Sequence, residues 1–528
     1  MHIPTTNELL RRIRQLRRIR QIREVRQEWT GFRRPGRLAA TAAAALVVIA
    51  LGLLPAFGGH TSCDGPCPPE PTGPDGSRVN DQFYFLHRDL GENGSITVRM
   101  TSMSGTITYP PPDHDRIVPG LVPWAKAGII IKDGVRQGSS YAALMLTGGH
   151  GVRMQYDYRH DIAGSGGRVS AGSPRWLRLT RSADTITGYE SADGRQWTKV
   201  GTAQLSGLPG TVQAGLFATS PGDLTLRSAG LGGATEEVRF TQAGGTFDRV
   251  VLKNAPSAGG WRSDAVGEMN RTDWEKYHRA SGAVQENGTI SVTGTGDIGP
   301  GGTEGGGRPV ERSLGGLVPG LLIVLVVAVR FAASEYRHGP GCGMPVTRRM
   351  LVARAVVVGA VAFVTGLLSV GVVITVGAAV LKENGTAVAG VSVLTGVRVV
   401  VGTSAVLALS AVLATALGAL LRHRVRLALL VAVLTIVGPY AATSVPLLPD
   451  GLSRWLLRLT PSAGFAARQT LVEHPQVIDH YAPSTGYFPL PWWAGISVLC
   501  GYVVVLLGFA LSRLPRGGGP TGRSGHGS

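Results

Sequence analysis

The chain has 528 residues, of which 44% are hydrophobic, and it carries a formal net charge of +18. Its apolar residues are gathered into runs of Ala, Val, Leu and Gly, which alternate with polar stretches rich in Gly, Pro and Thr. The positive charge lies at the N-terminus and beside the apolar runs, a placement typical of membrane topology and not of a surface that follows phosphates. Composition therefore favours a membrane protein of several domains and argues against nucleic acid as a partner.

Residues 1–37 are predicted to form a basic amphipathic helix on the cytoplasmic side. Between residues 8 and 29, apolar side chains recur every three to four positions among arginines: Leu9, Ile13, Leu16, Ile19, Ile22, Val25 and Trp29. Such a helix can lie on the inner leaflet, with membrane lipid as its partner, or it can be a solvated helix that only sets orientation.

Six apolar runs are long enough to cross a bilayer. They are expected at residues 38–57, 314–333, 355–381, 399–421, 427–445 and 492–511. The basic region before the first run is longer than the n-region of a signal peptide, so an uncleaved anchor is expected in place of a cleaved signal. Trp492 and Trp493 open the last run as an interfacial anchor.

The basic flanks of the runs predict the orientation. Arginines occur before the first run, in the loop 334–354, between the fourth and fifth runs, and in the tail 512–528. All of these fall on one side, which is therefore the cytoplasm, and residues 58–313 are expected outside it. Arginines in the long loop 446–491 run slightly counter to this orientation, which places that loop outside. Short interfacial or re-entrant helices are expected in the loop. The predicted location is the plasma membrane, as a multi-pass protein.

The region outside the membrane reads as an all-β sandwich. Residues 58–78 are a Pro-rich tether, 79–302 hold the predicted strands, and 303–313 are a Gly-rich return linker. Ile96, Val98 and Met100 alternate with polar residues, as in a half-buried strand. Asp193-Gly194 between two strand-like segments is typical of a hairpin, and many short strands with Gly and Pro punctuation favour a sandwich.

The same region contains polar clusters without a recognisable catalytic pattern. One holds His150, Asp157, His160 and Asp161, and another is Asp113-His114-Asp115. Both are interpreted as polar groups of loops and of the surface. Five tryptophans (Trp124, Trp176, Trp197, Trp261 and Trp274) could offer a sugar-stacking platform, but packing in the core is the favoured interpretation. No enzymatic activity and no metal site are predicted.

Cys63 and Cys67 lie close together just after the first apolar run. On an oxidising side of the membrane they could form a small disulfide loop. Zinc would require further ligands nearby, and the sequence offers none.

The apolar runs predict a conduit that is driven from elsewhere. Arg330, Arg354 and Arg398 lie only at run ends, whereas ion-coupled carriers usually need ionisable groups or broken helices at the midplane. Gly438-Pro439 is the one clear break. The sequence has no Gly-x-x-x-x-Gly-Lys-Ser/Thr loop, so no cofactor is expected on this chain and ATP would be bound and hydrolysed by a partner.

The order of four short motifs on a six-span frame resembles type-2 ABC exporter permeases, in an actinobacterial branch with a large domain between spans one and two. The motifs are Glu28-Trp29-Thr30-Gly31-Phe32-Arg33, Glu335-Tyr336-Arg337-His338-Gly339, Gly438-Pro439-Tyr440 and Leu459-Thr460-Pro461-Ser462-Ala463-Gly464-Phe465. The resemblance implies a homodimer or heterodimer of permeases with two cytoplasmic ATP-binding cassette ATPase subunits.

The resemblance also places the coupling to the ATPase in the loop 334–354. The residues implied are Glu335, Tyr336, Arg337, Arg348 and Arg349. This chain departs from the family at residues 339–345, where three glycines and two prolines replace a helical segment. Either docking has moved to residues 346–350 and the N-terminal helix, or transport is impaired.

The outer domain resembles concanavalin-like sandwiches through residues 127–133, 176–179 and 191–197. Related folds often bind carbohydrate, so cell-envelope carbohydrate is a further expected partner at the level of the fold. The alternative function is a membrane-anchored carbohydrate-binding or envelope-sensing protein that acts through its sandwich. An anchor needs only one or two spans, which favours the permease.

Overall fold

The computed structural model describes residues 22–58, 71–109, 116–229, 233–256, 260–267, 281–301, 313–334, 347–384, 392–444, 448, 450–477 and 481–515. The chain divides into two compact units, each considered separately below. The helical unit comprises Met1–Gly65, Arg308–Val472 and Tyr481–Ser528, and the sandwich unit comprises Pro66–Gly307 and Glu473–His480. The expected division into an α-helical part and an inserted all-β part is confirmed.

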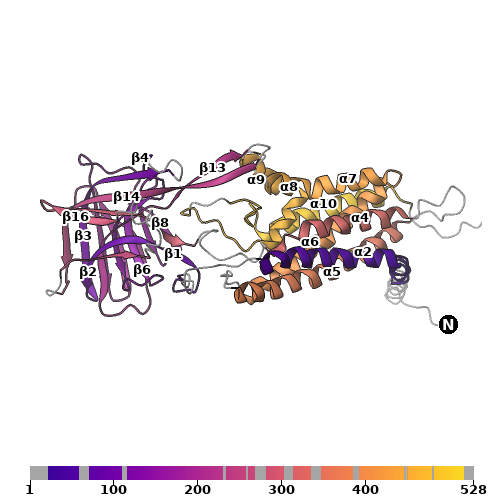
Figure 1. The fold of residues 1–528 in the computed structure, drawn as a ribbon, viewed down its shortest axis with the longest axis horizontal. Coiled ribbons are helices and arrows are strands. Elements are labelled where there is room, and N and C mark those ends of the chain that lie inside the picture. Colours follow the sequence, from indigo (N-terminus) through magenta and orange to yellow (C-terminus); the bar gives the residue numbers. More distant parts are fainter. Residues whose placement is uncertain are drawn as a thin grey trace, which may run out of the picture. The chain divides into compact units, whose positions relative to one another are not determined.

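The helical unit consists of apolar helices that run side by side (Figure 1). They are α2 (Pro35–Gly58), α4 (Leu317–Ala333), α5 (Arg348–Glu383), α6 (Val393–Leu420), α7 (Val425–Ile436), α8 (Gly438–Ser444), α9 (Asp450–Leu459), the 3-10 helix η3 (Pro461–Arg468) and α10 (Trp492–Ser512), and residues 22–32 are also helical. Four of them, α2, α5, α6 and α10, are long and apolar enough to cross a membrane, and α7 with α8 would make a fifth span. The sixth predicted span corresponds to α4, which has 17 residues, so the count of six remains a prediction.

Small residues let these helices approach closely. A Cβ on Gly366 of α5 would lie 2.8 Å from the Cα of Ser404 in α6. A Cβ on Gly320 of α4 would lie 2.3 Å from a methyl group of Val48 in α2. Association through small residues suits helices in an apolar solvent, where lipid and side chain are equally apolar and close packing decides.

The predicted break at Gly438-Pro439 separates α7 from α8, which meet at a bend of 43°. Pro439 has no backbone N–H to continue the helical ladder. The hydroxyl of Ser462 in η3 donates to the carbonyl of Ile436 at 2.7 Å, so a buried neighbour satisfies a backbone acceptor at the break. The two short helices α9 and η3 occupy the segment where interfacial or re-entrant helices were expected.

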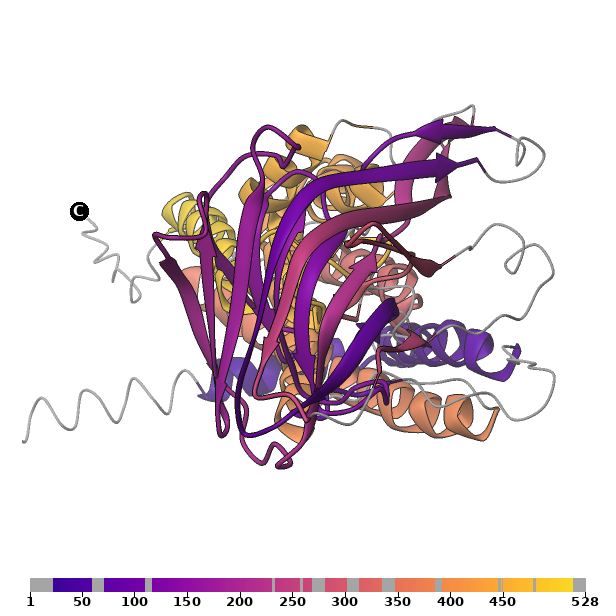
Figure 2. The same cartoon turned by 90° about the vertical axis from the view of Figure 1, so that its left-hand side faces the viewer.

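Figure 2 shows the sandwich unit facing the viewer. The described residues of this unit form eighteen strands. They are β1 (Val79–Asp81), β2 (Phe83–Leu90), β3 (Asn93–Thr108), β4 (Ile117–Pro119), β5 (Lys126–Lys132), β6 (Tyr141–Thr147), β7 (Gly151–Tyr156), β8 (His160–Ala163), β9 (Arg175–Ser182), β10 (Thr185–Ser191), β11 (Thr198–Gln204), β12 (Val212–Thr219), β13 (Asp223–Ala229), β14 (Gly233–Lys253), β15 (Arg262–Val266), β16 (Gly282–Glu286), β17 (Thr289–Gly294) and β18 (Ile298–Pro300).

Two antiparallel sheets enclose the main core. One has nine strands: seven follow the path β11-β10-β9-β3-β14-β17-β16, while β13 pairs with β14 and β4 with β3. The other has seven strands in the order β15-β2-β12-β5-β6-β7-β8. Ile96, Val98 and Met100 are fully buried, as the alternation predicted, and the first two pair in register with Leu179 and Leu177 of β9. The predicted hairpin is β10–β11, so that expectation is also confirmed.

Strands β5 and β6 of the seven-stranded sheet are buried on both faces. Every residue of β5 is buried, although only Ala127, Ile129 and Ile131 belong to the core between the sheets. Ile130, on the opposite side of β5, belongs to a second apolar cluster. That cluster includes Val79 of β1 and Ile298 of β18, so the two-stranded ribbon β1–β18 covers this face. The ribbon is formed by the segments through which the chain enters and leaves the sandwich.

Candidate functional site

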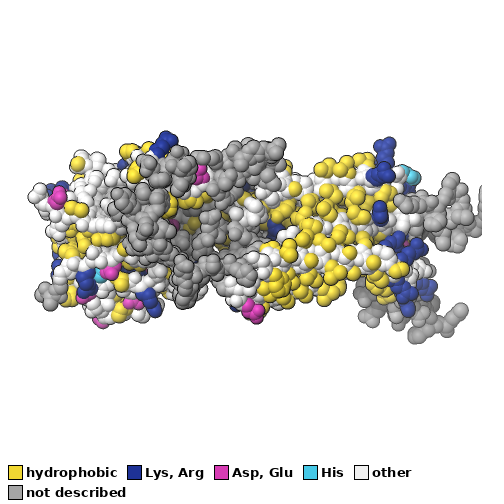
Figure 3. All heavy atoms as spheres, in the orientation of Figure 1, with side chains coloured by type: hydrophobic (Ala, Val, Ile, Leu, Met, Phe, Trp, Pro, Cys, Tyr) yellow, Lys and Arg dark blue, Asp and Glu magenta, His cyan; other side chains and the backbone are white. Residues whose placement is uncertain are grey.

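Arginines gather at one end of the helical unit (Figure 3). We call this the arginine-rich end. Its described arginines lie just before or at the start of α2, near the end of α4, at the start of α5, between α6 and the first turn of α7, and directly after α10. They are Arg33, Arg34, Arg37, Arg330, Arg348, Arg349, Arg422, Arg424, Arg426 and Arg513. The rest of the unit's surface in this view is mostly apolar. Charged ends on an apolar bundle are the pattern of helices whose termini meet water or lipid headgroups.

Two of the five residues implied in coupling to an ATPase lie at this end. The guanidinium of Arg348 donates to the carbonyl of Leu514 at 2.9 Å, which joins the start of α5 to the end of α10. Arg349 is exposed. Glu335, Tyr336 and Arg337 lie outside the described residues, as does the Gly/Pro-rich segment 339–345.

A buried ion pair at the same end was missed by sequence reasoning. Arg354, expected at a span end, lies in the second turn of α5 and is only 2% exposed. Its Nε donates to Glu28 at 3.0 Å and its NH1 donates to the carbonyl of Ala332 at 3.2 Å. The pair therefore joins the helical segment 22–32 to α5. Glu28, an acidic residue in a segment dominated by arginines, was the available signal.

Aromatic rings complete this junction. The guanidinium carbon of Arg354 lies 5.6 Å from the ring centroid of Phe331, and that of Arg37 lies 4.6 Å from the same ring. Phe32 meets Phe331 edge-on at 5.2 Å. A desolvated charge needs both its partner and further polar or π contacts; here the motif before α2 supplies the carboxylate of Glu28, and α4 supplies the ring of Phe331 and the carbonyl of Ala332.

A second buried arginine lies away from the arginine-rich end, where η3 packs on α8 and α10. Arg468 is 5% exposed, and its NH2 donates to the hydroxyl of Tyr440 at 2.8 Å. Its guanidinium lies 5.0 Å, 5.8 Å and 5.2 Å from the ring centroids of Tyr440, Phe465 and Phe488, respectively. Its Nε has no hydrogen-bond partner, and no salt bridge to Arg468 is found in the part of the chain that the structure describes. An ionisable group of this kind in an apolar bundle is a functional candidate.

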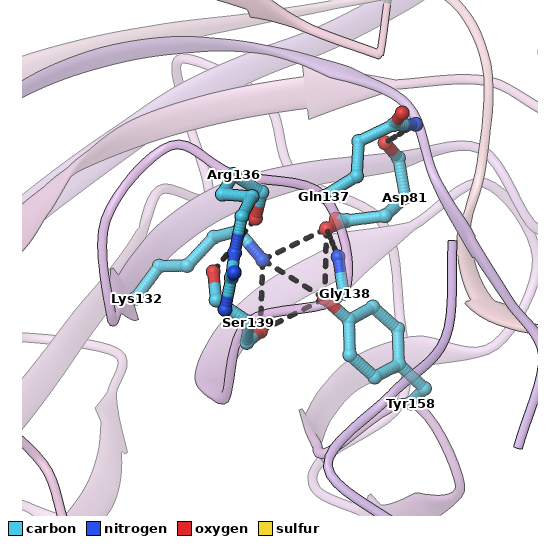
Figure 4. Close-up of polar contacts among 7 residues, drawn as sticks. All are labelled: Asp81, Lys132, Arg136, Gln137, Gly138, Ser139 and Tyr158. Atoms are coloured by element: carbon cyan, nitrogen blue, oxygen red, sulfur yellow. Dashed lines mark hydrogen bonds and ion pairs between the residues drawn. The ribbon is translucent and has the colours of Figure 1, made fainter. Parts of the chain in front are cut away.

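The sandwich unit holds a buried polar cluster around Lys132, at the end of β5 (Figure 4). Its Nζ donates to Asp81 Oδ2 at 2.8 Å, to the carbonyl of Ser139 at 2.9 Å and to the hydroxyl of Tyr158 at 2.8 Å. The backbone N–H of Gly138 also donates to Asp81 Oδ2, at 2.8 Å. All three hydrogens of the ammonium group are thus used, in a site where both charged side chains are fully buried.

Burial governs the protonation of this cluster. It lowers the pKa of Lys132, and the neighbouring Asp81 carboxylate opposes that change. Burial raises the pKa of Tyr158, and the charge of Asp81 adds to the effect, so the phenol stays protonated. The Lys132 ammonium and Asp81 Oδ2 are held in fixed hydrogen bonds, Asp81 Oδ1 is buried without a hydrogen-bond partner, and neither charged side chain is exposed to a ligand. We interpret it as a structural lock.

Lys126, at the other end of β5, makes the matching pair. Its Nζ donates to Asp297 at 2.6 Å and to the carbonyl of Ile298 at 2.6 Å. Asp81 ends β1 and Asp297 directly precedes β18, so the two lysines fasten the entry and exit segments of the sandwich to one strand. Because the lysines are six residues apart, they lie on the same face of β5.

The described side chains of the first polar cluster have separate partners. His150 stacks on Trp124 with ring centroids 4.1 Å apart, and His160 stacks on Tyr156 at 4.3 Å. Asp161 pairs with Arg153. No group of three His, Cys, Asp or Glu residues suited to a metal occurs among the described residues, and Asp113, His114 and Asp115 fall outside them.

The four described tryptophans do not belong to the core between the sheets, where packing was the favoured interpretation. Trp124 is buried, whereas Trp176, Trp197 and Trp261 are only partly buried. The guanidinium of Arg178 covers the ring of Trp197 at 3.8 Å. Trp274, Cys63 and Cys67 lie outside the described residues, so the expected disulfide remains a prediction.

Comparison with known proteins supplies no family. No family model matches the chain, and no curated protein matches it. Among solved structures, scytalido-glutamic peptidase with a transition state analog inhibitor is 11% identical, with 40% of this chain and 98% of that chain covered and a TM-score of 0.27. A functionally unknown protein from Saccharomyces cerevisiae is 16% identical, with 33% and 76% covered and a TM-score of 0.19.

The GH43 BlXynB protein from Bacillus licheniformis is 13% identical, with 33% of this chain and 28% of that chain covered and a TM-score of 0.18. Likenesses of this strength carry no argument about fold or function. The functional reasoning below therefore uses this chain's own residues and the family resemblance of its motifs.

Proposed function

We propose that this chain is the permease subunit of an ATP-binding cassette exporter, powered by a separate cytoplasmic ATPase. The observation that carries the proposal is the bundle of apolar helices with arginines gathered at one end. With α4 and the bent α7–α8 pair counted as spans, six helical passes cross the bilayer. The arginine-rich end then faces the cytoplasm, both termini lie there, and the sandwich, which we take to be concanavalin-like, lies outside.

The α4 helix is the weakest span by length but is compatible with crossing. Seventeen residues give a helix of about 25 Å, and a hydrocarbon core of about 30 Å accommodates a shorter helix by local thinning. Eleven of its residues are buried against neighbours, so its position is set by packing as well as by lipid.

Unpartnered hydroxyls inside the bundle support a conduit rather than a plain anchor. Thr403 and Ser410 of α6 are buried, and their side-chain oxygens have no hydrogen-bond partner within the described ranges. Seven residues separate them, so they lie on one face of the helix. Buried polar groups without partners require an explanation, and a polar substrate path beside α6 would provide one.

The junction at the arginine-rich end supports coupling. Glu28 and Arg354 tie the helical segment 22–32 to α5, so a force applied to this segment would be passed to α5. Arg349 is exposed beside it and can accept a carboxylate from a partner. Together with Glu335, Tyr336, Arg337 and Arg348, these residues make up the proposed docking surface.

The test is a detergent pull-down of the tagged chain from its native membrane, followed by mass spectrometry. We expect a P-loop ATPase to be recovered, and to be lost when residues 335–349 are replaced by a Gly/Ser linker. Replacement of residues 516–523 by the same type of linker is the control and should retain the ATPase. Recovery of envelope glycans or a signalling partner without any ATPase would refute the permease and favour the membrane-anchored binding protein.

A further inference from the structure

A cavity of about 520 Å³ opens between α2, α4 and α7 at the arginine-rich end. Three arginines line it: Arg34 just before α2, Arg37 in the first turn of α2, and Arg330 near the end of α4. The remaining lining is largely apolar and includes Ala40, Val327 and Val425. The cavity thus combines cationic groups from the α2 and α4 sides with lining that matches hydrocarbon.

The arginines of this cavity differ in how they are held. The NH1 of Arg37 donates to the carbonyl of Gly31 at 2.8 Å, and its guanidinium lies over Phe331, so its position is fixed. Arg34 and Arg330 are exposed, and no salt bridge to either is found within the ranges that the structure describes. Three like charges around one hollow repel one another unless an anion lies between them.

We propose that this cavity binds the phosphate headgroup of an anionic phospholipid, with its acyl chains along Ala40, Val327 and Val425. Guanidinium groups present planar forks of N–H donors that match phosphate oxygens. The apolar walls exclude a small hydrated anion as the natural ligand, because they would bury nothing against it. Anionic lipids are enriched in the cytoplasmic leaflet, where the proposed topology puts this end.

The inference requires that the helices span a bilayer, but it does not require an ATPase partner. The full chain, purified in mild detergent, is titrated with phosphatidylglycerol or with phosphatidylcholine of the same acyl chains, and bound lipid is counted by native mass spectrometry. We expect a preference for phosphatidylglycerol. The double variant Arg34→Gln/Arg330→Gln should weaken its binding about tenfold or more and leave phosphatidylcholine unchanged.

The matched control removes two charges from the same end without touching the cavity. Arg422→Gln/Arg513→Gln should change phosphatidylglycerol binding by less than about twofold, since neither arginine lines the cavity and each would meet a lipid only through charge screened by solvent. Equal losses in the two double variants would show general electrostatic attraction and overturn the proposal. Equal retention of the two lipids by the unaltered chain would overturn it as well.

A second variant separates lipid from free phosphate. Ala40→Trp fills the cavity while all three arginines remain, and it should abolish binding of phosphatidylglycerol. Inorganic phosphate in large molar excess should not displace the lipid from the unaltered chain. Displacement by phosphate, or undiminished lipid binding in Ala40→Trp, would overturn the proposal. Unchanged melting temperature and a monodisperse elution profile establish that each variant is folded.

Discussion

The two units of this protein treat a buried cation in different ways. In the sandwich, Lys132 has a buried carboxylate and two further oxygen acceptors for its three hydrogens. In the helical unit, Arg468 has one phenolic hydroxyl and three aromatic faces, and its Nε is unpartnered. Glu28–Arg354 lies between these cases, with one carboxylate and one backbone carbonyl.

This difference distinguishes buried cations that stabilise the fold, which we call structural locks, from buried cations that serve a function, which we call working positions. A fully paired cation fixes two chain segments to each other, as Lys132 fixes β1 to β5, and removal of either partner orphans the other. A cation without a carboxylate orphans no acid when it is removed, so its retention in an apolar bundle is better explained by function. The predictions below test this ranking of Lys132, Arg354 and Arg468.

The largest loss of stability is expected from Lys132→Met. It leaves the carboxylate of Asp81 buried without its cation, which costs about 3–5 kcal/mol of the sandwich's free energy of unfolding. Hydrogen exchange of β1 and β5, followed by mass spectrometry on the full chain, measures the effect regionally. The double variant Asp81→Leu/Lys132→Met should recover most of the loss. A double variant as unstable as Lys132→Met would mean that packing, not charge, dominates here.

A somewhat smaller loss of stability is expected from Arg354→Met, because the side chain of Glu28 is partly exposed to solvent. Removal of the cation should cost about 2–4 kcal/mol and should release the segment 22–32 from α5. Protease accessibility of that segment in detergent checks the prediction. Glu28→Gln should release it as well, whereas Arg33→Gln, an exposed neighbour, should not. Equal protection in all three variants would contradict a lock at this junction.

The sequence predicts much of the fold and little of these locks. Hydrophobic runs locate the helices, and the alternation at Ile96, Val98 and Met100 locates β3, because both signals are local in the chain. The partners of the locks are distant: Asp81 is 51 positions from Lys132, Asp297 is 171 from Lys126, and Glu28 is 326 from Arg354. Only the tertiary arrangement brings them together, so no local pattern could reveal them.

Some sequence-based expectations fail for a related reason. The tryptophans were expected in the core, yet Trp176 and Trp197 lie partly exposed under arginines from neighbouring segments. An aromatic residue in a strand indicates a half-buried position but does not say which face it occupies. The candidate coupling residues came from a resemblance, and the structure shows beside them the buried ion pair Glu28–Arg354.

For Arg468→Met we expect a much smaller effect on stability than for the two locks. The variant loses cation–π contacts and one hydrogen bond, together about 2 kcal/mol or less, and leaves no carboxylate unpaired. The melting temperature of the purified chain measures this. Tyr440→Phe is the matched control for the hydrogen bond alone. A loss as large as that of Lys132→Met would break the distinction between lock and working position.

The smallest effects on stability are expected at two aspartates in turns, whose pKa values change in opposite directions on folding. Burial raises the pKa of Asp157, so the folded state favours its protonated form. A raised acid pKa in the folded state lowers stability as pH rises through that pKa, and the penalty persists at neutral pH. Asp157→Asn should therefore stabilise the sandwich slightly above the raised pKa, and asparagine tolerates the positive φ of 44° there.

Asp193 is the matched opposite, since backbone N–H groups of Arg195 and Gln196 hold its pKa below the ordinary value. Its carboxylate contributes stability above the unfolded pKa, and this contribution is lost as pH falls through the folded pKa. Asp193→Asn should therefore destabilise the sandwich at neutral pH, with the difference vanishing in acid. Hydrogen exchange of β10 and β7, compared between neutral and acidic pH, resolves the two signs. The same sign for both variants would mean that these turns respond to lost hydrogen bonds and not to charge.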